Sequence, residues 1–440
     1  MRLNVLASRL RDDHDTVAQL AADLGQTPGG GVWRVFLGAA RSGQNLTGSP
    51  RSVRAMNEQN TTISPFTLHV PDESLAALTT RLQQTRWPVE DARTGWDHGV
   101  PVDYAKELVT YWASEFDWRA QERRINAVPQ FTTPIDGHDV HFFHVRSANH
   151  GATPLLLLHG WSGAPTEFLP MIDPLVDPDS HGGESEDSFD VVIATIPGFG
   201  VSGPAVGWNT DRAAAAMVTL MARLGYQRYA VHGYDTGALI GRSIGLIDRE
   251  HLVGLHLTDV LGGEELTPET AEFSDPREAR AVERAMSYQY ELGGYAIVQA
   301  TRPQSLGLAL TDSPVGLLTW LVERFRDWSA AEDSPEEVFS KDDMLTTVSI
   351  YWHFATIWSS MRYYKEGASG WGVEPERSEA PLAIVAMPHD LGSAVPRTVE
   401  GANNLVRWEE LAKGGHFAGW EQPDLMVQDI RSAVRVLRAH

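Results

Sequence analysis

The sequence predicts an α/β fold in which a mostly parallel, doubly wound sheet is interrupted by an inserted helical cap. Short apolar runs, typical of strands buried in a parallel sheet, alternate with segments of helical length. These runs are residues 154–159, 189–195, 229–231, 252–257 and 381–387. The alternation stops over residues 262–375, which are rich in helix-start signals, and resumes beyond them. The sheet is therefore expected in two parts, 151–261 and 376–440, with the cap between them.

Composition limits the kinds of protein that this chain can be. Its 440 residues are long enough for roughly two or three domains and a large core. A formal net charge of −22 argues against nucleic acid or an anionic membrane as a partner. The sequence has no cysteine, which excludes disulfides, thiolate nucleophiles and cysteine-bound metals. No apolar run reaches membrane-spanning length and the N-terminus lacks a signal-peptide core, so we expect a cytoplasmic protein.

Residues 1–61 differ from the rest of the chain. Residues 3–24 have the spacing of an amphipathic helix, three glycines follow at 29–31, and residues 43–54 are polar. Sequence typical of a folded domain begins near Met56. Our hypothesis is that Met56 is the native start and that the preceding residues are a disordered or misassigned extension. The intact mass of the native protein tests this, because a mass that includes the preceding residues would exclude misassignment.

Residues 62–150 are predicted to form a helical and partly extended meander ahead of the sheet. Pro71-Asp-Glu-Ser has the proline and the acidic residues of a helix start. Residues 103–118 have helical periodicity, and residues 131–145 are predicted to form a β-hairpin around Asp136-Gly. Further helices of the sheet region are expected at 168–176, 211–224 and 423–437.

A short motif, Gly233-Tyr-Asp-Thr-Gly237, joins the predicted strand 229–231 to a helix. Small residues on both sides of an acid, between a strand and a helix, are typical of a nucleophile elbow with Asp235 at its tip. A carboxylate nucleophile forms an alkyl ester, so it suits attack on the sp3 carbon of an epoxide or an alkyl halide. By itself the motif also fits an ordinary turn.

The residues after the elbow fit an α/β-hydrolase fold, in which nucleophile, acid and histidine follow successive strands in that order. His416, between the last strand and the last helix, is the candidate histidine. Asp390 follows the strand 381–387 and is the preferred acid, with Asp259, after an earlier strand, as its rival. His389, beside Asp390, is expected at the surface.

Two further sets of groups complete the candidate site. His159-Gly160-Trp161 follows the first buried strand, so the backbone N–H groups of Trp161 and Thr236 are expected to form an oxyanion hole. Ring opening also needs a donor to the epoxide oxygen, and a phenol can supply it. The cap contains several tyrosines, most of them expected to be structural. They are Tyr288, Tyr290, Tyr295, Tyr351, Tyr363 and Tyr364.

Taken together, these motifs resemble those of the microsomal-type epoxide hydrolases, which carry an N-terminal meander before the α/β-hydrolase core. The resemblance covers most of residues 62–438. The matching segments are Pro71–Pro88, His159–Trp161, Pro197–Gly200, Gly233–Gly237, Gly294–Gln299, Asp312–Leu317, Tyr351–Trp352, Ser359–Glu366 and Gly414–Ala418. The resemblance also places the acid on Asp390. It implies Tyr295 and Tyr364 as donors to the epoxide oxygen, and Tyr363 is the neighbour from which Tyr364 must be distinguished.

The resemblance implies a two-step reaction that needs no metal and no organic cofactor. Asp235 attacks an epoxide carbon, His416 held by Asp390 then activates water to hydrolyse the ester, and a vicinal diol leaves. An epoxide and water are the expected partners, without nucleic acid or membrane, and a homodimer is left open.

Two departures from the family pattern matter. The family usually has tryptophan after the nucleophile, whereas this chain has Thr236, so we expect a roomier pocket beside Asp235. Residues 1–55 contain no apolar anchor of the kind found in membrane-bound relatives, which suggests a soluble, bacterial-type member. A role in detoxification, or on a bulky epoxide of natural-product biosynthesis, would suit these features.

Two alternatives follow from the same residues. A haloalkane dehalogenase would use the same aspartate and needs halide donors such as Trp161, but paired cap tyrosines would then be redundant. A hydrolase fold retained as a ligand-binding module is the non-enzyme alternative. The set of Asp235, Asp390 and His416 argues against it. Diol formation from an epoxide, without halide release from haloalkanes, would distinguish the three.

Overall fold

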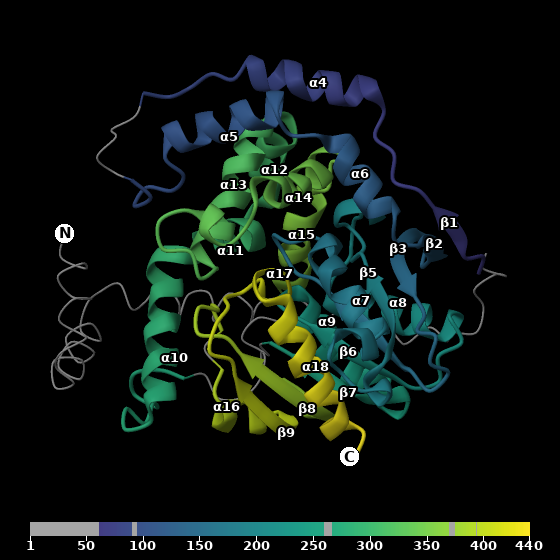
Figure 1. Ribbon diagram of the computed structural model, residues 1–440. Coiled ribbons are helices and arrows are strands. Elements are labelled where there is room, and N and C mark those ends of the chain that lie inside the picture. The colour runs from purple at the N-terminus through teal and green to yellow at the C-terminus, as the bar shows by residue number, and fades with distance from the viewer. Residues whose placement is uncertain (1–60, 90–94, 259–265, 369–374, 393) are drawn as a thin grey trace, which may run out of the picture.

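A computed structural model describes residues 61–89, 95–258, 266–368, 375–392 and 394–440 (Figure 1). Predictions about residues 1–60, including the helix at 3–24 and the start at Met56, lie outside these ranges, as does Asp259. The described chain is built around one twisted sheet with helices on both faces and a helical cap beside it (Figure 1).

The sheet of the described chain has nine strands in the order β1-β2-β3-β5-β4-β6-β7-β8-β9. The pairs β1–β2, β2–β3 and β3–β5 are antiparallel, and the remaining five pairs are parallel. The strands are β1 (Ser64–Phe66), β2 (Gln130–Ile135), β3 (His138–Val145), β4 (Thr153–Leu158), β5 (Phe189–Ala194), β6 (Tyr229–Gly233), β7 (Leu252–Leu257), β8 (Ser378–Ala386) and β9 (Asn403–Glu410). The predicted fold class, a mostly parallel α/β sheet, is therefore confirmed. The predicted hairpin is β2 and β3, with Asp136 and Gly137 at positive φ in its turn.

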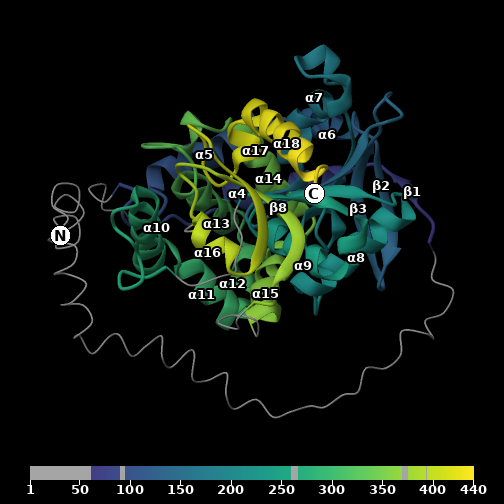
Figure 2. The ribbon, with the colours of Figure 1, turned by 90° about the horizontal axis from the view of Figure 1, so that it is seen from below.

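Helices cover both faces of the sheet, as a doubly wound fold requires. Figure 2 shows α7 and α18 on one side and α8 and α9 on the other. Apolar side chains of the central strands are fully buried between these layers. The helices are α7 (Ile172–Val176), α8 (Thr210–Arg223), α9 (Thr236–Ile247) and α18 (Pro423–Leu437).

Two predicted helices are wrong in detail. The helix expected at 168–176 is a 3-10 helix, Pro165–Met171, followed by the short α7, because Pro170 cannot donate a helical hydrogen bond. The helix expected at 103–118 ends as α5 at Ser114, and α6 (Trp118–Asn126) follows it. Asp117 caps α6 by accepting a hydrogen bond from the Ala120 N–H at 3.0 Å, which starts a new helix.

A helical cap lies between β7 and β8 in the chain order. Its elements are α10 (Pro276–Ser287), the π-helix η8 (Tyr288–Leu292), α11 (Gly294–Thr301), α12 (Pro303–Asp312), α13 (Pro314–Asp327), α14 (Lys341–His353) and α15 (Ile357–Gly367). The meander helices α4 (Asp72–Gln83) and α5 (Val102–Ser114) lie across it (Figure 1). The buried Trp112 indole donates to Ser349 Oγ at 3.1 Å, and the Arg81 guanidinium pairs with Asp312 at 3.0 Å. The meander therefore holds the outer side of the cap.

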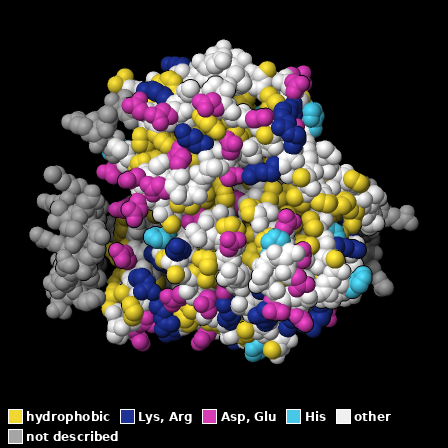
Figure 3. Space-filling view, in the orientation of Figure 1, with side chains coloured by type: hydrophobic (Ala, Val, Ile, Leu, Met, Phe, Trp, Pro, Cys, Tyr) yellow, Lys and Arg dark blue, Asp and Glu magenta, His cyan; other side chains and the backbone are white. Residues whose placement is uncertain are grey.

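The surface carries both signs of charge. On the face seen in Figure 3, Lys and Arg side chains are interspersed with Asp and Glu. Among the described helices, none alone has the length and apolar character to cross a bilayer. The pair α12 and α13 meets those criteria only when taken together, and it is bent by 115°.

Candidate active site

Asp235 lies at the tip of a sharp turn between β6 and α9. Its φ of 50° and ψ of −126° are in a region that non-glycine residues rarely adopt. The flanking glycines permit this turn, because a Cβ on Gly237 would lie 2.1 Å from the Leu158 carbonyl oxygen. A Cβ on Gly233 would lie 2.5 Å from the Gly237 carbonyl oxygen. Backbone packing thus requires the two glycines of the motif Gly233–Gly237. The resulting turn directs the Asp235 carboxylate away from the sheet.

The two carboxylate oxygens of Asp235 have different surroundings. Oδ1 accepts hydrogen bonds from the Trp161 backbone N–H and from the Thr236 hydroxyl, both at 2.8 Å. Oδ2 faces the imidazole of His416, whose Nε2 is 3.7 Å away. A Cβ on Gly160 would lie 2.5 Å from Oδ1, so only glycine leaves room for the carboxylate there. One oxygen is therefore held by fixed donors, while the other is turned toward the histidine.

His416 and Asp390 are brought together by two loops that follow neighbouring strands. His416 Nδ1 is 2.8 Å from Asp390 Oδ1, and both side chains are buried. The loops are joined by a backbone hydrogen bond from the His389 N–H to the Gly414 carbonyl at 3.1 Å. The side chain of His389 is exposed, as predicted. Gly415 passes so close to α13 that a Cβ on it would lie 2.7 Å from the Trp328 carbonyl oxygen.

The contact between His416 and Asp390 shifts the pKa of both side chains. Burial by itself lowers the pKa of His416, but the charges of Asp390, Asp235 and Glu167 and the hydrogen bond to Asp390 raise it to about 9. Burial acts in the opposite direction on Asp390. There the His416 charge and hydrogen bond, together with the Leu391 N–H, hold the carboxyl pKa below its usual range. The pair is therefore an imidazole oriented and made basic by a buried carboxylate.

The two predicted cap tyrosines lie together against Trp161, in the loop His159–Trp161 that follows β4. The ring of Tyr295, on α11, stacks on Trp161 with centroids 5.1 Å apart and an interplanar angle of 6°. Tyr364, on α15, meets both rings edge to face at 6.0 Å. Tyr363 points elsewhere and contacts Phe199 at 5.6 Å, so Tyr364 is the member of the pair that lies at the site.

Both tyrosines are kept in their protonated form. Burial raises the pKa of Tyr295 and of Tyr364 well above the ordinary value, and the negative charge of Asp235 raises each further. A buried phenol that stays protonated can act only as a neutral hydrogen-bond donor or acceptor near Asp235.

Sequence reasoning predicted neither of two contacts that Tyr295 makes, although it named Tyr288 among the cap tyrosines. The hydroxyl of Tyr288, the first residue of the π-helix η8, donates to the Tyr295 hydroxyl at 3.1 Å. The guanidinium of Arg324 lies 5.2 Å from the centre of the Tyr295 ring. The spacing of Tyr288 and Tyr295, close to two helical turns, was the only sequence signal for the first contact. Nothing in the sequence distinguished Arg324 from other arginines.

Buried polar groups hold the loop His159–Trp161 in place. His159 accepts from the Ile196 N–H at 3.2 Å through Nε2 and donates from Nδ1 to the Gly160 carbonyl at 3.1 Å. Burial lowers the His159 pKa to about 4, so this histidine is neutral. Glu167 accepts from the Tyr234 hydroxyl and from the Ala164 N–H, and burial raises its pKa to about 8. These contacts fix the position of the Trp161 N–H.

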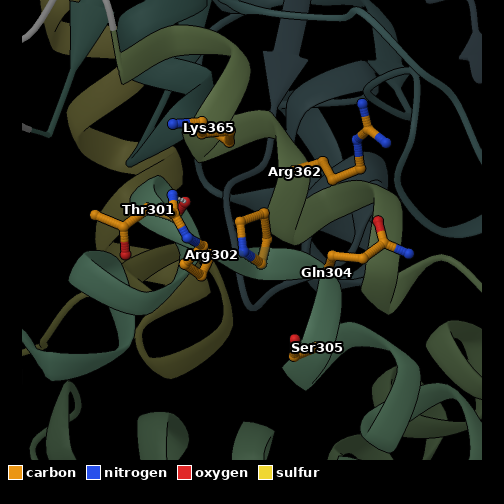
Figure 4. A pocket seen from close by; sticks show the side chains of 7 residues that line it. Thr301, Arg302, Gln304, Ser305, Arg362 and Lys365 are labelled. Atoms are coloured by element: carbon orange, nitrogen blue, oxygen red, sulfur yellow. Dashed lines mark hydrogen bonds between the residues drawn. The ribbon is translucent and has the colours of Figure 1, made fainter.

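A separate pocket lies in the cap, between α15 and the segment where α11 ends and α12 begins (Figure 4). Its volume is about 230 Å³. It is lined by Thr301, Arg302, Pro303, Gln304, Ser305, Arg362 and Lys365. The side chains of Arg362 and Lys365 point away from each other (Figure 4). No predicted site residue lines this pocket, so it is distinct from the group around Asp235.

The sheet, the elbow and the helical cap define the class of protein, an α/β-hydrolase. The model of the α/β-hydrolase fold matches residues 153–423, and the model of the epoxide hydrolase N terminus matches residues 63–168. The chain belongs to the epoxide hydrolase family and is an enzyme of that class.

Relatives and solved structures agree with this assignment. Epoxide hydrolase 1 of Sus scrofa is 35% identical over 412 residues, covering 86% of this chain and 90% of that protein. A protein of Stigmatella aurantiaca (strain DW4/3-1), whose name places it provisionally among the epoxide hydrolases, is 40% identical over 380 residues, covering 86% of both chains. The crystal structure of juvenile hormone epoxide hydrolase from the silkworm Bombyx mori superposes with a TM-score of 0.79 at 28% identity, covering 87% of this chain and 96% of that one. Family membership favours epoxide hydrolysis over the dehalogenase and binding-module alternatives.

Proposed function

We propose that this enzyme opens an epoxide through a covalent ester on Asp235. The observation that carries the proposal is the unequal setting of the two carboxylate oxygens, with Oδ1 held by donors and Oδ2 turned toward His416. In the first step Oδ2 attacks an epoxide carbon, and the carbon–oxygen bond of the ring breaks. The hydroxyls of Tyr295 and Tyr364 hydrogen-bond the departing oxygen, which takes up a proton from solvent water. The product of this step is a hydroxyalkyl ester.

The second step hydrolyses the ester. His416 Nε2 removes a proton from water as the water oxygen attacks Cγ of Asp235, and negative charge develops on Oδ1. The N–H groups of Trp161 and Thr236 stabilise that charge, since Trp161 already donates to Oδ1 and Thr236 is in the first turn of α9, where amide donors lack helical acceptors. The intermediate collapses, the bond from Cγ to Oδ2 breaks, and the diol leaves with a proton from His416. The carboxylic acid left on Asp235 then releases its proton to solvent, which regenerates the carboxylate and balances the proton taken up in the first step.

Trapping the ester tests the two-step scheme. His416→Gln keeps alkylation possible and removes the base, so incubation with an accepted epoxide should add the mass of one epoxide to the protein. Asp235→Asn is the matched control and should show no adduct. An unmodified His416→Gln protein, after exposure to an epoxide that the wild type converts to diol, would contradict the scheme.

We also propose that the substrate is a bulky epoxide, of the kind found in natural-product pathways. The support is Thr236, which occupies less space beside the nucleophile than tryptophan. Thr236→Trp should narrow the range of epoxides accepted without removing activity on small ones. A panel of epoxides, compared by kcat/KM with chiral analysis of the diols, measures this, and an unchanged profile would show that this position does not shape the pocket.

We further propose a cytoplasmic location for the native enzyme, which cell fractionation tests. Light scattering of the purified protein determines whether it is a homodimer.

A further inference from the structure

The Thr236 side chain makes a contact that its backbone role does not require. Its hydroxyl donates a hydrogen bond to Asp235 Oδ1 at 2.8 Å, and the Trp161 N–H donates to that same oxygen at 2.8 Å. The side chain is buried. A carboxylate oxygen only accepts hydrogen bonds, so the threonine hydroxyl must supply the proton.

The contact is built by the fold. Thr236 is the first residue of α9, and the strained φ of Asp235 turns the carboxylate back over the start of that helix. Gly160 lets the carboxylate take this position, because a Cβ on that residue would lie 2.5 Å from Oδ1. In the free enzyme the hydroxyl and Oδ1 are therefore already in contact before any substrate binds.

The charge on Oδ1 changes in a defined order during that cycle. In the free carboxylate, Oδ1 carries about half of the negative charge. Alkylation of Oδ2 converts Oδ1 into the neutral carbonyl oxygen of an ester, and attack by water then places a full negative charge on it. A fixed donor at Oδ1 consequently stabilises the reactant of the first step and the transition state of the second.

We propose that the Thr236 hydroxyl is a third oxyanion donor, which slows alkylation of Asp235 slightly and accelerates hydrolysis of the ester. This inference rests on the proposed ester mechanism. Thr236 then has a catalytic role in addition to shaping the pocket. The side chain at this position would determine whether ester formation or ester hydrolysis limits turnover.

The test compares Thr236→Val with Thr236→Ser under single-turnover and steady-state conditions. Valine keeps the shape and removes the donor, whereas serine keeps the donor and removes the methyl group. Quenched-flow mass spectrometry of the intact protein, with styrene oxide, measures formation and decay of the ester. We expect Thr236→Val to slow ester decay by about 10- to 100-fold, somewhat less than loss of a sole side-chain oxyanion donor, while ester formation is unchanged or faster. Thr236→Ser should stay within about threefold of the wild type in both steps.

Three outcomes would overturn the inference. They are equal slowing of both steps in Thr236→Val, wild-type ester decay in Thr236→Val, or slow decay in Thr236→Ser as well. Thermal unfolding of each variant separates loss of the donor from loss of the fold. If His416→Gln also fails to form an ester, the proposed function itself is wrong. If the ester forms but Thr236→Val does not alter its decay, only the role of the hydroxyl is refuted.

Discussion

Asp235 and His416 come from the α/β core, whereas Tyr295 and Tyr364 come from the cap, and the two pairs are held by different means. The core residues follow the ends of parallel strands and are positioned by strand order, backbone packing and charged hydrogen bonds. The cap residues are positioned by ring contacts with Trp161 and with each other. In the mechanism that we propose, the core therefore supplies the groups that gain and lose charge, and the cap supplies neutral donors. Loss of a core group should stop the chemistry, while loss of a cap donor should weaken it.

The largest effect is expected at the core nucleophile. Asp235→Asn should reduce turnover at least about 10⁴-fold, because the amide is a poor nucleophile and the other carboxyl groups of the site, on Asp390 and Glu167, are bound to His416 and Tyr234. Diol formation from styrene oxide measures it. Asp136→Asn is the matched control, because Asp136 also has a positive φ, 51° against 50°, but lies in the hairpin turn. Substantial residual activity of Asp235→Asn, with the fold intact, would refute the assignment of the nucleophile.

The cap donors should each have a smaller effect. Tyr295→Phe or Tyr364→Phe should slow ester formation by about 10²-fold, since one donor to the epoxide oxygen remains in each variant. The double variant should lose considerably more. Tyr363→Phe is the control, because that side chain contacts Phe199 instead of the Trp161 cluster. An effect of Tyr363→Phe as large as that of Tyr364→Phe would contradict the assignment.

The rates of the two steps should depend on pH in different ways, because ester hydrolysis uses a core residue and ester formation uses the cap tyrosines. In the free enzyme the pKa of His416 is raised to about 9, so the imidazole is protonated below that value. Alkylation removes the charge of Asp235, one of the causes of the raised pKa, and the pKa in the ester should be lower than about 9. Ester hydrolysis needs neutral His416, so its rate should fall as the pH falls through that lower pKa, and the ester should accumulate in acid.

The cap tyrosines have raised pKa values, so the rate of ester formation should not decline in mild alkali through tyrosine ionisation. Rapid-quench measurement of both steps across pH checks this, and a decline in ester hydrolysis toward alkaline pH would contradict it.

The smallest effect is expected at Tyr288, a positioning residue. Its hydroxyl donates to Tyr295, so Tyr288→Phe should slow ester formation by about fivefold, the value of one neutral hydrogen bond, without changing ester hydrolysis. Tyr290→Phe is the control, because Tyr290 lies in the same π-helix with its side chain exposed. A change in hydrolysis, or equal effects of the two substitutions, would show that the contact does not serve the first step.

Local pattern and chain order were enough to predict much of this protein. Buried parallel strands have continuous apolar runs, and small residues around an acid between a strand and a helix are typical of an elbow, so the sheet and the position of Asp235 could be predicted from the sequence. The loops that carry Asp390 and His416 also followed, because the carboxyl ends of parallel strands meet at one edge of a sheet. The predictions at 103–118 and 168–176 were wrong where Asp117 and Pro170 altered the helices through local capping and a missing donor.

The sequence by itself determined the fold class, the elbow and the order of the core residues, since these depend on periodicity and on neighbours along the chain. Only the tertiary structure decided which adjacent tyrosine lies at the site, that Tyr288 donates to Tyr295, and that the Thr236 hydroxyl donates to the Asp235 carboxylate. The physical reason is that a side-chain contact depends on how separate helices are rotated and packed. That geometry is the sum of many weak interactions, and no local pattern in the chain encodes it.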